Sequence, residues 1–411
     1  MSGWRDVSLG EGIDVLHGFA FKGEYFRDEG DLIVLTPGNF FDGGGFKPKD
    51  GREKYYDGPF PRRFLLAAGD VVVAMTEQVQ GLLGSSATIP VDHVYLHNQR
   101  IGLLRITAPD VLDERFVYHL MNTPCVRSQI QATATGSKVR HTAPERIKAV
   151  RVSAPSLPMQ RRLASILDSI DDLVKNSRRR VEVLEETARA VYQEWFVHFR
   201  YPGHVEAPLV GPPTLIPRGW EVRSLGELAV NHDRRRRPLS KAARAERRGT
   251  FPYYGAAKLI DWVDGWIFDG EHLLFAEDGT VQTADGFPVL QLVDEQFWAN
   301  NHTHILQGHG VSTRFLYLAC AAQPIAGYVT GAAQPKITQA NLNQMPIVVA
   351  TPDLQHQFDK VIDPIFDEWR VLRRAADQLV SLRDFLLPKL VTGQIDMSRL
   401  DLEALTAAAT T

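Results

Sequence analysis

The 411-residue sequence contains only two cysteines, Cys125 and Cys320, one in each half of the chain. Two isolated thiols build neither a disulfide framework nor a cysteine-based zinc site, and they are typical of a reducing compartment. The first residues lack the apolar core of a signal peptide. A long uncharged stretch, residues 315–335, is interrupted by proline and glycine, which predicts a buried helix followed by a loop rather than a membrane span. Together these absences predict a cytoplasmic protein.

An excess of charge of one sign is absent as well. The chain has 46 Lys and Arg residues against 49 Asp and Glu residues, which gives a net charge of −3. This balance excludes a uniformly basic nucleic-acid binder, although it allows a local basic patch. The content of 44% hydrophobic and 23% charged residues is ordinary for a globular protein and excludes wholesale disorder. At roughly 100–200 residues per domain, the length predicts two to four domains.

The common catalytic signatures are also missing, since there is no GxxxxGKS/T phosphate loop, no GxSxG elbow and no HExxH pair. The most tempting metal or catalytic group is the trio His302, His304 and His309, because closely spaced imidazoles can bind zinc. A strand that places His302 and His304 on one face explains the same spacing, and no cysteine lies nearby. We therefore predict no catalytic residue and no metal ligand in this chain.

The clearest positive pattern is one internal repeat. Trp4 and the SLGE sequence of residues 8–11 recur 216 positions later, as Trp220 and residues 224–227. Further matches follow in the same order in both halves: Arg115–Tyr118 with Arg314–Tyr317, Thr135-Gly136 with Thr330-Gly331, Pro155 with Pro352, and Gln160 with Gln357. A period of about half the chain predicts two copies of one unit rather than a solenoid of small repeats.

Each copy has the same internal plan, a mixed region followed by a long helix. Short β-like runs between Gly, Pro and Asp residues mark the mixed regions: Asp31–Thr36, Asp70–Thr76, Glu271–Ala276 and Val289–Val293. Apolar residues at spacings of three and four then predict helices over residues 158–198 and 353–391. Pro364 is expected to kink the second helix or delay its start, and Pro388 to end it or kink it near its end.

A helix of about 40 residues is roughly 60 Å long, and one apolar stripe on it needs a partner. The simplest partner is the other long helix, in an antiparallel coiled-coil-like pair; the alternative is that each helix packs only on its own domain. The residues expected in the helix-pairing and partner interface are Ile166, Ile170, Leu173, Leu184, Ile365, Trp369, Leu372 and Leu379. The predicted fold class is α+β, with two mixed α/β domains separated by two long helices and related by an internal pseudo-two-fold repeat.

The strongest DNA-binding signal is a basic segment in the second copy. Residues 234–248 contain eight basic residues and one acid, and the aromatic sequence FPYYG of residues 251–255 follows. Arg and Lys can contact phosphates or base edges, and Tyr can pack on sugars or bases, whereas a solvated flexible loop is the alternative. The DNA-binding candidates in this segment are Arg234, Arg235, Arg236, Arg237, Lys241, Tyr253 and Tyr254.

Weaker candidates lie in the duplicated Thr-Gly loops. The first loop leads to Lys138 and Arg140, and the second leads to Lys336. Their duplicated position favours DNA contact, and a purely structural loop is the alternative. Lys22, in the less basic corresponding region of the first copy, completes the set. A rod of roughly 60 Å exceeds one turn of B-DNA, about 34–36 Å, so two such regions could contact separated half-sites.

Several stretches carry a resemblance to a known family. Two sets look like two recognition-domain variants: residues 18–22 with 69–76, and residues 251–256 with 267–271 and 300–302. Residues 155–160 and 352–357 resemble the family's PPLxEQ helix start, although Met159 and His356 replace its usual acid, and residues 386–393 resemble its C-terminal helix end. Over nearly its whole length the chain resembles the specificity (S) subunit of a type I restriction-modification system.

The resemblance implies a non-catalytic subunit that reads a split DNA sequence. It implies target-recognition domains over residues 1–155 and 201–350, spacer helices over 156–200 and 351–395, and a flexible tail over 396–411. Double-stranded DNA and two DNA-methyltransferase (M) subunits are the implied partners, with motor-nuclease (R) subunits for restriction. S-adenosylmethionine is expected on the M subunits, and no cofactor on this chain.

The two domains differ in sequence, which predicts an asymmetric bipartite DNA target. The alternatives are a stand-alone two-headed DNA-binding or scaffold protein and, from a third class, an enzyme built on the three histidines.

Overall fold

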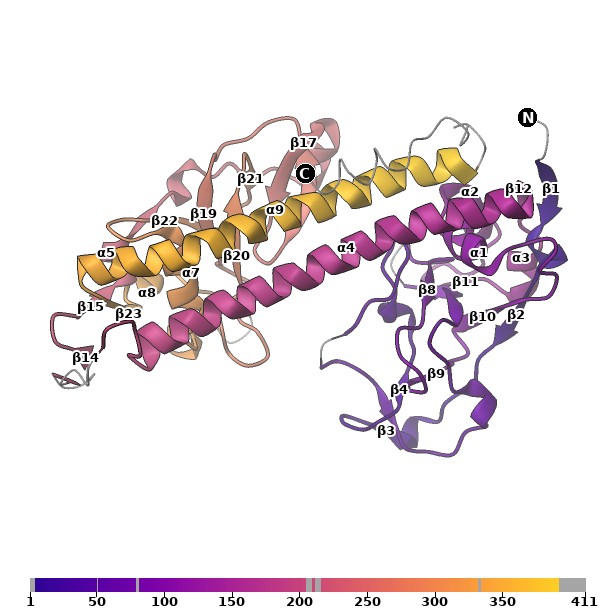
Figure 1. Cartoon of the computed structure of the whole chain (residues 1–411), viewed down its shortest axis with the longest axis horizontal. Helices are drawn as coiled ribbons and strands as arrows, with labels where there is room; N and C mark the ends of the chain where they lie inside the picture. The colour runs from indigo at the N-terminus through magenta and orange to yellow at the C-terminus, as the bar shows by residue number, and fades with distance from the viewer. Residues whose placement is uncertain are drawn as a thin grey trace. The chain divides into compact units, whose positions relative to one another are not determined.

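The computed structural model describes residues 4–49, 51–78, 81–204, 209–210, 216–331 and 334–391. The chain divides into two compact units, Met1–Lys175 with Ala375–Thr411, and Asn176–Arg374 (Figure 1). Each unit contains a mixed α/β region and one segment from each of two long helices. No helix in the described part of the chain is long and apolar enough to cross a membrane. The predicted tail, residues 396–411, lies outside the described residues.

The α/β region of unit 1 is built on a four-stranded antiparallel sheet of order β2-β10-β6-β8. The strands of the whole region are β1 (Arg5–Ser8), β2 (Ile13–His17), β3 (Phe26–Arg27), β4 (Ile33–Val34), β5 (Tyr55–Tyr56), β6 (Val71–Ala74), β7 (Thr76–Glu77), β8 (Ser86–Thr88), β9 (Tyr95–Leu96), β10 (Ile101–Ile106), β11 (Arg140–His141) and β12 (Arg151–Ala154). Its shorter helices are α1 (Glu114–Met121), α2 (Pro124–Ala132) and α3 (Pro144–Lys148). A second small sheet has the order β3-β5-β4-β9, and β1 pairs with β12.

The α/β region of unit 2 repeats this plan with the sheet order β16-β22-β19-β20 and the pair β15-β23. Its strands are β13 (Leu209–Val210), β14 (Ile216–Pro217), β15 (Glu221–Ser224), β16 (Ala229–Asn231), β17 (Arg248–Tyr254), β18 (Leu259–Val263), β19 (Glu271–Ala276), β20 (Leu290–Asp294), β21 (Trp298–Ala299), β22 (Thr303–Gly308) and β23 (Pro346–Val349). Its shorter helices are α5 (Leu225–Leu228), α6 (Lys241–Glu246), α7 (Thr313–Ala321) and α8 (Gln339–Asn343). The second small sheet has the order β18-β17-β21.

The repeated SLGE sequence has the same local role in both units. Ser8 and Glu11 form a capping box, in which the Ser8 N–H donates to the Glu11 carboxylate over 2.7 Å. Ser224 and Glu227 form the same box at 2.8 Å. A capping box satisfies two backbone donors at the start of a helical turn, which explains why Ser and Glu recur together at this spacing.

The two long helices are confirmed as α4 (Leu157–Tyr192) and α9 (Pro352–Val391). The expected delay at Pro364 and the expected end at Pro388 are both wrong, because α9 begins at Pro352 and continues to Val391. Pro364 has no N–H group, so the Lys360 carbonyl, four residues earlier, lacks its helical donor. Both residues are exposed, so water can bind this carbonyl instead. Pro352, at the first helical position, loses no intrahelical hydrogen bond.

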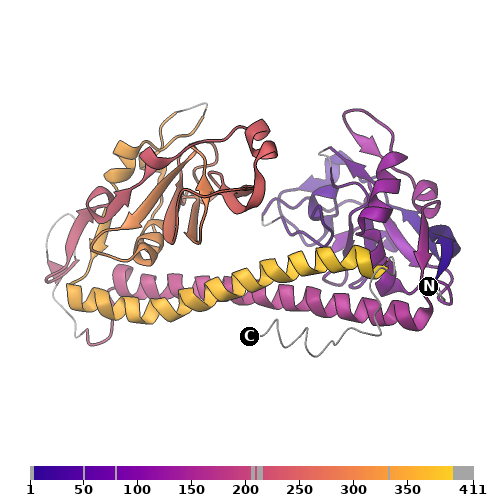
Figure 2. The same ribbon diagram turned by 90° about the horizontal axis from the view of Figure 1, so that it is seen from above.

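In each unit a segment of α4 packs against a segment of α9, side by side in both views (Figure 2). In unit 1, Leu163 shares a core cluster with Leu390, and farther along α4 the Asp171 carboxylate pairs with Arg383 over 2.8 Å. Residue numbers therefore rise along one helix and fall along the other, so the segments are antiparallel.

Unit 2 shows the same antiparallel direction, because Arg180 pairs with Glu368 and, later in α4, Tyr192 contacts Phe358. Of the eight predicted interface residues, Leu379 is buried and the other seven are half-buried.

The repeated RFxY sequence attaches each α/β region to its helix segments. Phe116 of α1 and Phe315 of α7 are completely buried. The arginine before each phenylalanine forms ion pairs with a long helix: Arg115 with Asp168 of α4, and Arg314 with Asp367 of α9. The core of each unit thus lies between the four-stranded sheet and the long helices, and α1 or α7 lies between these layers.

Candidate nucleic-acid interface

The basic segment of unit 2 is ordered and divides into anchoring and exposed side chains. It contains a 3-10 turn (Asp233–Arg235) and α6, whose N-terminus is capped by the Ser240 hydroxyl. The Arg236 side chain, only 15% exposed, pairs with Glu277 over 2.6 Å and donates to the Thr303 carbonyl over 2.7 Å. Arg236 therefore fixes the segment to the sheet, and its guanidinium does not face solvent.

Four other predicted basic residues of this segment are exposed: Arg234, Arg235, Arg237 and Lys241. The Arg235 guanidinium donates to the Ile267 carbonyl over 2.8 Å and lies 5.0 Å from the centre of the Phe268 ring. This contact orients Arg235 while leaving it accessible. The exposed set can bind phosphates without breaking any anchoring ion pair.

The structure places both predicted tyrosines in the core of unit 2. Tyr253 is completely buried, and its hydroxyl accepts a hydrogen bond from the Leu239 N–H at 2.9 Å. Tyr254 is 4% exposed, and its hydroxyl donates to Glu295 at 2.6 Å. Neither ring presents a face on which a base could stack, so their position here supports the strand β17 rather than a DNA contact.

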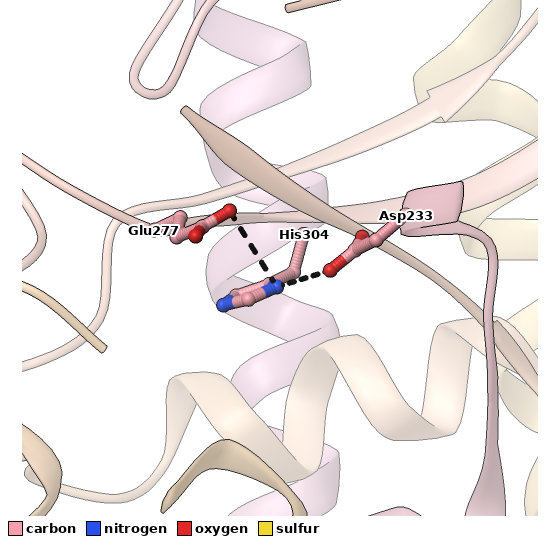
Figure 3. A group of neighbouring side chains, drawn as sticks. All are labelled: Asp233, Glu277 and His304. Carbon is pink, nitrogen blue, oxygen red and sulfur yellow. Dashed lines mark hydrogen bonds and ion pairs between the residues drawn. The ribbon is translucent and has the colours of Figure 1, made fainter. Parts of the chain in front are cut away.

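A buried histidine links the basic segment to the sheet (Figure 3). His304, 1% exposed on β22, has its Nδ1 atom 2.5 Å from an Asp233 carboxylate oxygen and its Nε2 atom 2.9 Å from the Ile337 carbonyl. Both partners are acceptors, an arrangement that favours the doubly protonated, cationic form of His304. Burial lowers the pKa of His304, but the hydrogen bond and charge of Asp233 outweigh burial and raise it above its ordinary value.

The group Asp233, Glu277 and His304 has its ligand atoms within 4.8 Å, a spacing that could hold a metal ion. Its chemistry does not favour one, because both His304 nitrogens are already hydrogen-bonded to acceptors. Glu277 is also paired with Arg236, and with Lys336 at 3.2 Å. Both carboxylates are thus already engaged with His304, Arg236 and Lys336 in ion pairs, which argues for a structural role rather than a metal centre.

The three histidines singled out in the sequence do not converge. His302 is exposed and pairs with Asp278 at 2.7 Å, and His309 is exposed beyond the end of β22. Sequence reasoning missed the partnership of His304 with Asp233. The available signal was Asp233, an acid directly before the arginine run.

The Thr-Gly loops of the two units have the same construction. Two backbone hydrogen bonds join Thr135 to His141, at 3.0 and 2.8 Å, and two join Thr330 to Lys336, both at 2.8 Å. The glycine after each threonine has a positive φ, +99° for Gly136 and +88° for Gly331, which other residues adopt only with strain. Residues 332–333 of the second loop lie outside the described residues.

A carboxylate at the end of a central strand anchors each loop. Glu77, in β7 directly beyond β6, pairs with Arg140 at 3.1 Å, and Glu277, after β19, pairs with Lys336. Arg140 is therefore half-buried and anchored, whereas Lys138 is exposed in the loop. Lys22 is exposed directly before a short 3-10 turn of unit 1, away from this loop in sequence.

In unit 2 the basic segment and the Thr-Gly loop, chosen separately from the sequence, meet at Glu277. Asp233 starts the basic segment and accepts from the Ile305 N–H over 2.9 Å, while the Ile337 N–H donates to the Glu277 carbonyl over 2.8 Å. One buried network thus positions two exposed cationic segments beside each other on unit 2.

A family model for the type I restriction modification DNA specificity domain matches the chain twice, over residues 1–186 and 217–370. The chain belongs to this specificity family. The two matches agree with the two copies seen in the sequence and with the repeated sheet topology of the two units. The family is that of DNA-recognition chains, and curated relatives are named as specificity subunits rather than as the catalytic subunits of type I restriction enzymes.

Two curated relatives support this assignment. The chain is 32% identical over 146 residues to a putative type I restriction enzyme specificity subunit of Haemophilus influenzae, a match covering 35% of this chain and 37% of the relative. It is 22% identical over 325 residues to the MjaIX specificity subunit of Methanocaldococcus jannaschii, covering 73% of each. The crystal structure of a type I restriction-modification S subunit from M. genitalium shares the fold, with a TM-score of 0.58, 16% identity and 96% of each chain covered.

Proposed function

We propose that this specificity-family chain reads an asymmetric bipartite DNA target and positions adenine-methyltransferase subunits on it. The observation that carries the proposal is the duplication of one family unit, whose second copy presents exposed cations beside a buried ion-pair network. The two units differ in their cationic surfaces, since residues 234–248 have no equally basic counterpart in unit 1. Different surfaces on a repeated scaffold favour two half-sites of different sequence.

The outward faces of the long helices offer the surface for the methyltransferase subunits. On α9, Val371 of unit 2 is 59% exposed and Phe385 of unit 1 is 58% exposed, although the opposite face of this helix is buried. Large apolar side chains exposed on a helix are typical of a protein interface. One M subunit on each unit, carrying S-adenosylmethionine and acting in the cytoplasm, fits this duplication, and R subunits add restriction.

The test is to coexpress the chain with its methyltransferase partner and to map methylated adenines in the host genome by sequencing. We expect methylation at two short, different half-sites separated by a fixed spacer. A single palindromic motif, or no methylation that depends on this chain, contradicts the proposal. A gel-shift comparison addresses the stand-alone alternative, because a scaffold or regulator binds one duplex tightly without the partner, whereas a specificity subunit gains most of its affinity with it.

A further inference from the structure

We propose that an aromatic edge on unit 2, made of Ile260, Trp262 and Trp266, contacts the DNA duplex directly. The proposal rests on the function proposed above and names a contact within it. The three side chains are 45%, 48% and 43% exposed, respectively. Ile260 and Trp262 lie on one face of β18, and Trp266 follows three residues after its end, so three large apolar side chains are exposed within seven residues, as at many binding sites.

The strand geometry explains why Ile260 and Trp262 are outside the core. β18 lies at the end of the sheet β18-β17-β21, and its side chains alternate between two faces. Val263 is completely buried, and Asp261 bonds Arg244 of α6 at 3.0 Å, so their face is covered. Ile260 and Trp262 occupy the opposite face, which remains exposed.

The charge around the edge identifies its partner as a polyanion. Residues 234–269 contain nine basic and four acidic residues. Two acids and two bases neutralise each other in ion pairs, Asp261 with Arg244 at 3.0 Å and Asp264 with Arg247 at 2.8 Å. Seven basic residues, one of them the anchored Arg236, then remain against two acids. Arg235 reaches the same loop as Trp266, because its guanidinium donates to the carbonyl of the next residue, Ile267.

Cations beside exposed rings fit a nucleic acid better than a protein surface. The guanidinium groups can contact phosphates, while the rings can pack on sugars and on the faces or edges of bases. Apolar side chains that contact DNA in this way can also open a base step. The aromatic edge would therefore add affinity that does not depend on charge, next to the charge-dependent contacts of the basic segment.

The experiment measures binding of the full chain, in complex with its methyltransferase partner, to a fluorescent duplex that carries the mapped methylation target. The variants are Trp262→Ala, Trp266→Ala and the double variant. Phe287→Ala is the matched control, because Phe287 is a 37% exposed aromatic of the same unit outside residues 234–269. Thermal unfolding of each variant checks the fold, and Trp262→Phe and Trp266→Phe test whether a ring alone restores binding.

We expect each alanine variant to lose about tenfold in affinity. The slope of log affinity against log salt should stay unchanged, because a neutral ring neutralises no phosphate. The phenylalanine variants should recover most of the affinity, and Phe287→Ala should bind like the wild type.

Wild-type affinity in both alanine variants overturns the proposal. So does a loss of methyltransferase copurification without a loss of intrinsic duplex binding, which would make the edge a protein interface. If the wild-type complex binds no duplex, the proposed function itself fails, and that result is separate from a difference between variants.

Discussion

Arg314 of α7 donates to the Asp367 carboxylate of α9 over 2.8 Å, while its Nε atom donates to Glu271 of β19 over 2.8 Å. One side chain, 12% exposed, therefore joins the sheet, the intervening helix and a long helix of unit 2. The equivalent Arg115 of unit 1 pairs with Asp168 but is 62% exposed. The same repeated residue thus makes a partly buried network in one unit and a surface contact in the other.

Replacing Arg314 by alanine should destabilise unit 2. Glu271, 24% exposed, would lose the cation that compensates its burial, and we expect a loss of about 2 kcal/mol. Arg115→Ala is the matched control and should cost less than about 1 kcal/mol, because exposed ion pairs contribute little. Urea unfolding of both variants measures the difference, and equal losses would contradict the distinction.

The repeat could be recognised from the sequence, and its physical meaning could not. Matching letters revealed SLGE and RFxY, but only the structure shows that the first is a capping box and the second an attachment to the helices. The pairings of Pro155 with Pro352 and of Gln160 with Gln357 are both wrong by two positions, because α4 begins at Leu157 and α9 at Pro352. Gln160 and Gln355 are both buried, and their N–H groups donate to the residues before the two helix starts, Ser156 and Thr351.

The sequence also could not show which arginines of the basic segment are anchored and which are exposed. Arg234 and Arg236 are identical residues two positions apart. The local 3-10 turn directs the first side chain outward and the second toward Glu277. Tyr253 and Tyr254 point to opposite faces of β17. Both are buried because one face packs on the main sheet and the other is covered by residues around α6.

The charge of His304 predicts a specific pH dependence of stability. Because the folded chain raises the pKa of His304 above 6.5, this stabilisation is fully present below about pH 6.5 and is lost as the pH rises through the raised pKa. His304→Gln should flatten this alkaline loss, and His309→Gln, at an exposed position, should leave it unchanged. The free energy of unfolding in urea between about pH 6 and pH 9 gives the comparison.

Two other buried groups change the free energy of unfolding as the pH falls, so they do not produce the alkaline loss that this test measures. Burial lowers the pKa of His272, so the unfolded chain takes up its proton first and stability falls as the pH drops. The pKa of Asp233 is lowered, because its bonds to His304 outweigh burial, and its contribution is also lost only as the pH falls. An alkaline loss that persists in His304→Gln would show that another group is responsible.

Substitutions on the exposed face and on the buried face of α9 should have different effects. Val371→Asp, at a 59% exposed position, should change the free energy of unfolding by less than about 0.5 kcal/mol but reduce copurification with the methyltransferase subunit. Leu379→Asp, at a 6% exposed position, should instead destabilise unit 1 by about 3 kcal/mol or more, through a buried unpaired charge. Unimpaired methyltransferase binding by a folded Val371→Asp variant would remove this face from the interface.

Substitutions of neighbouring arginines in the basic segment should affect different properties, one DNA binding and the other stability. Arg234→Ala removes an exposed cation, so we expect weaker duplex binding and a salt slope smaller by about 0.9, the value for one phosphate contact on B-DNA. Its unfolding free energy should match the wild type. Arg236→Ala leaves Glu277 without its closest cation and should mainly lower the stability of unit 2. A salt titration of DNA binding, together with urea unfolding, distinguishes the two. If Arg234→Ala keeps the wild-type salt slope, the exposed part of the segment makes no phosphate contact at that position, and the DNA-facing surface must lie elsewhere on unit 2.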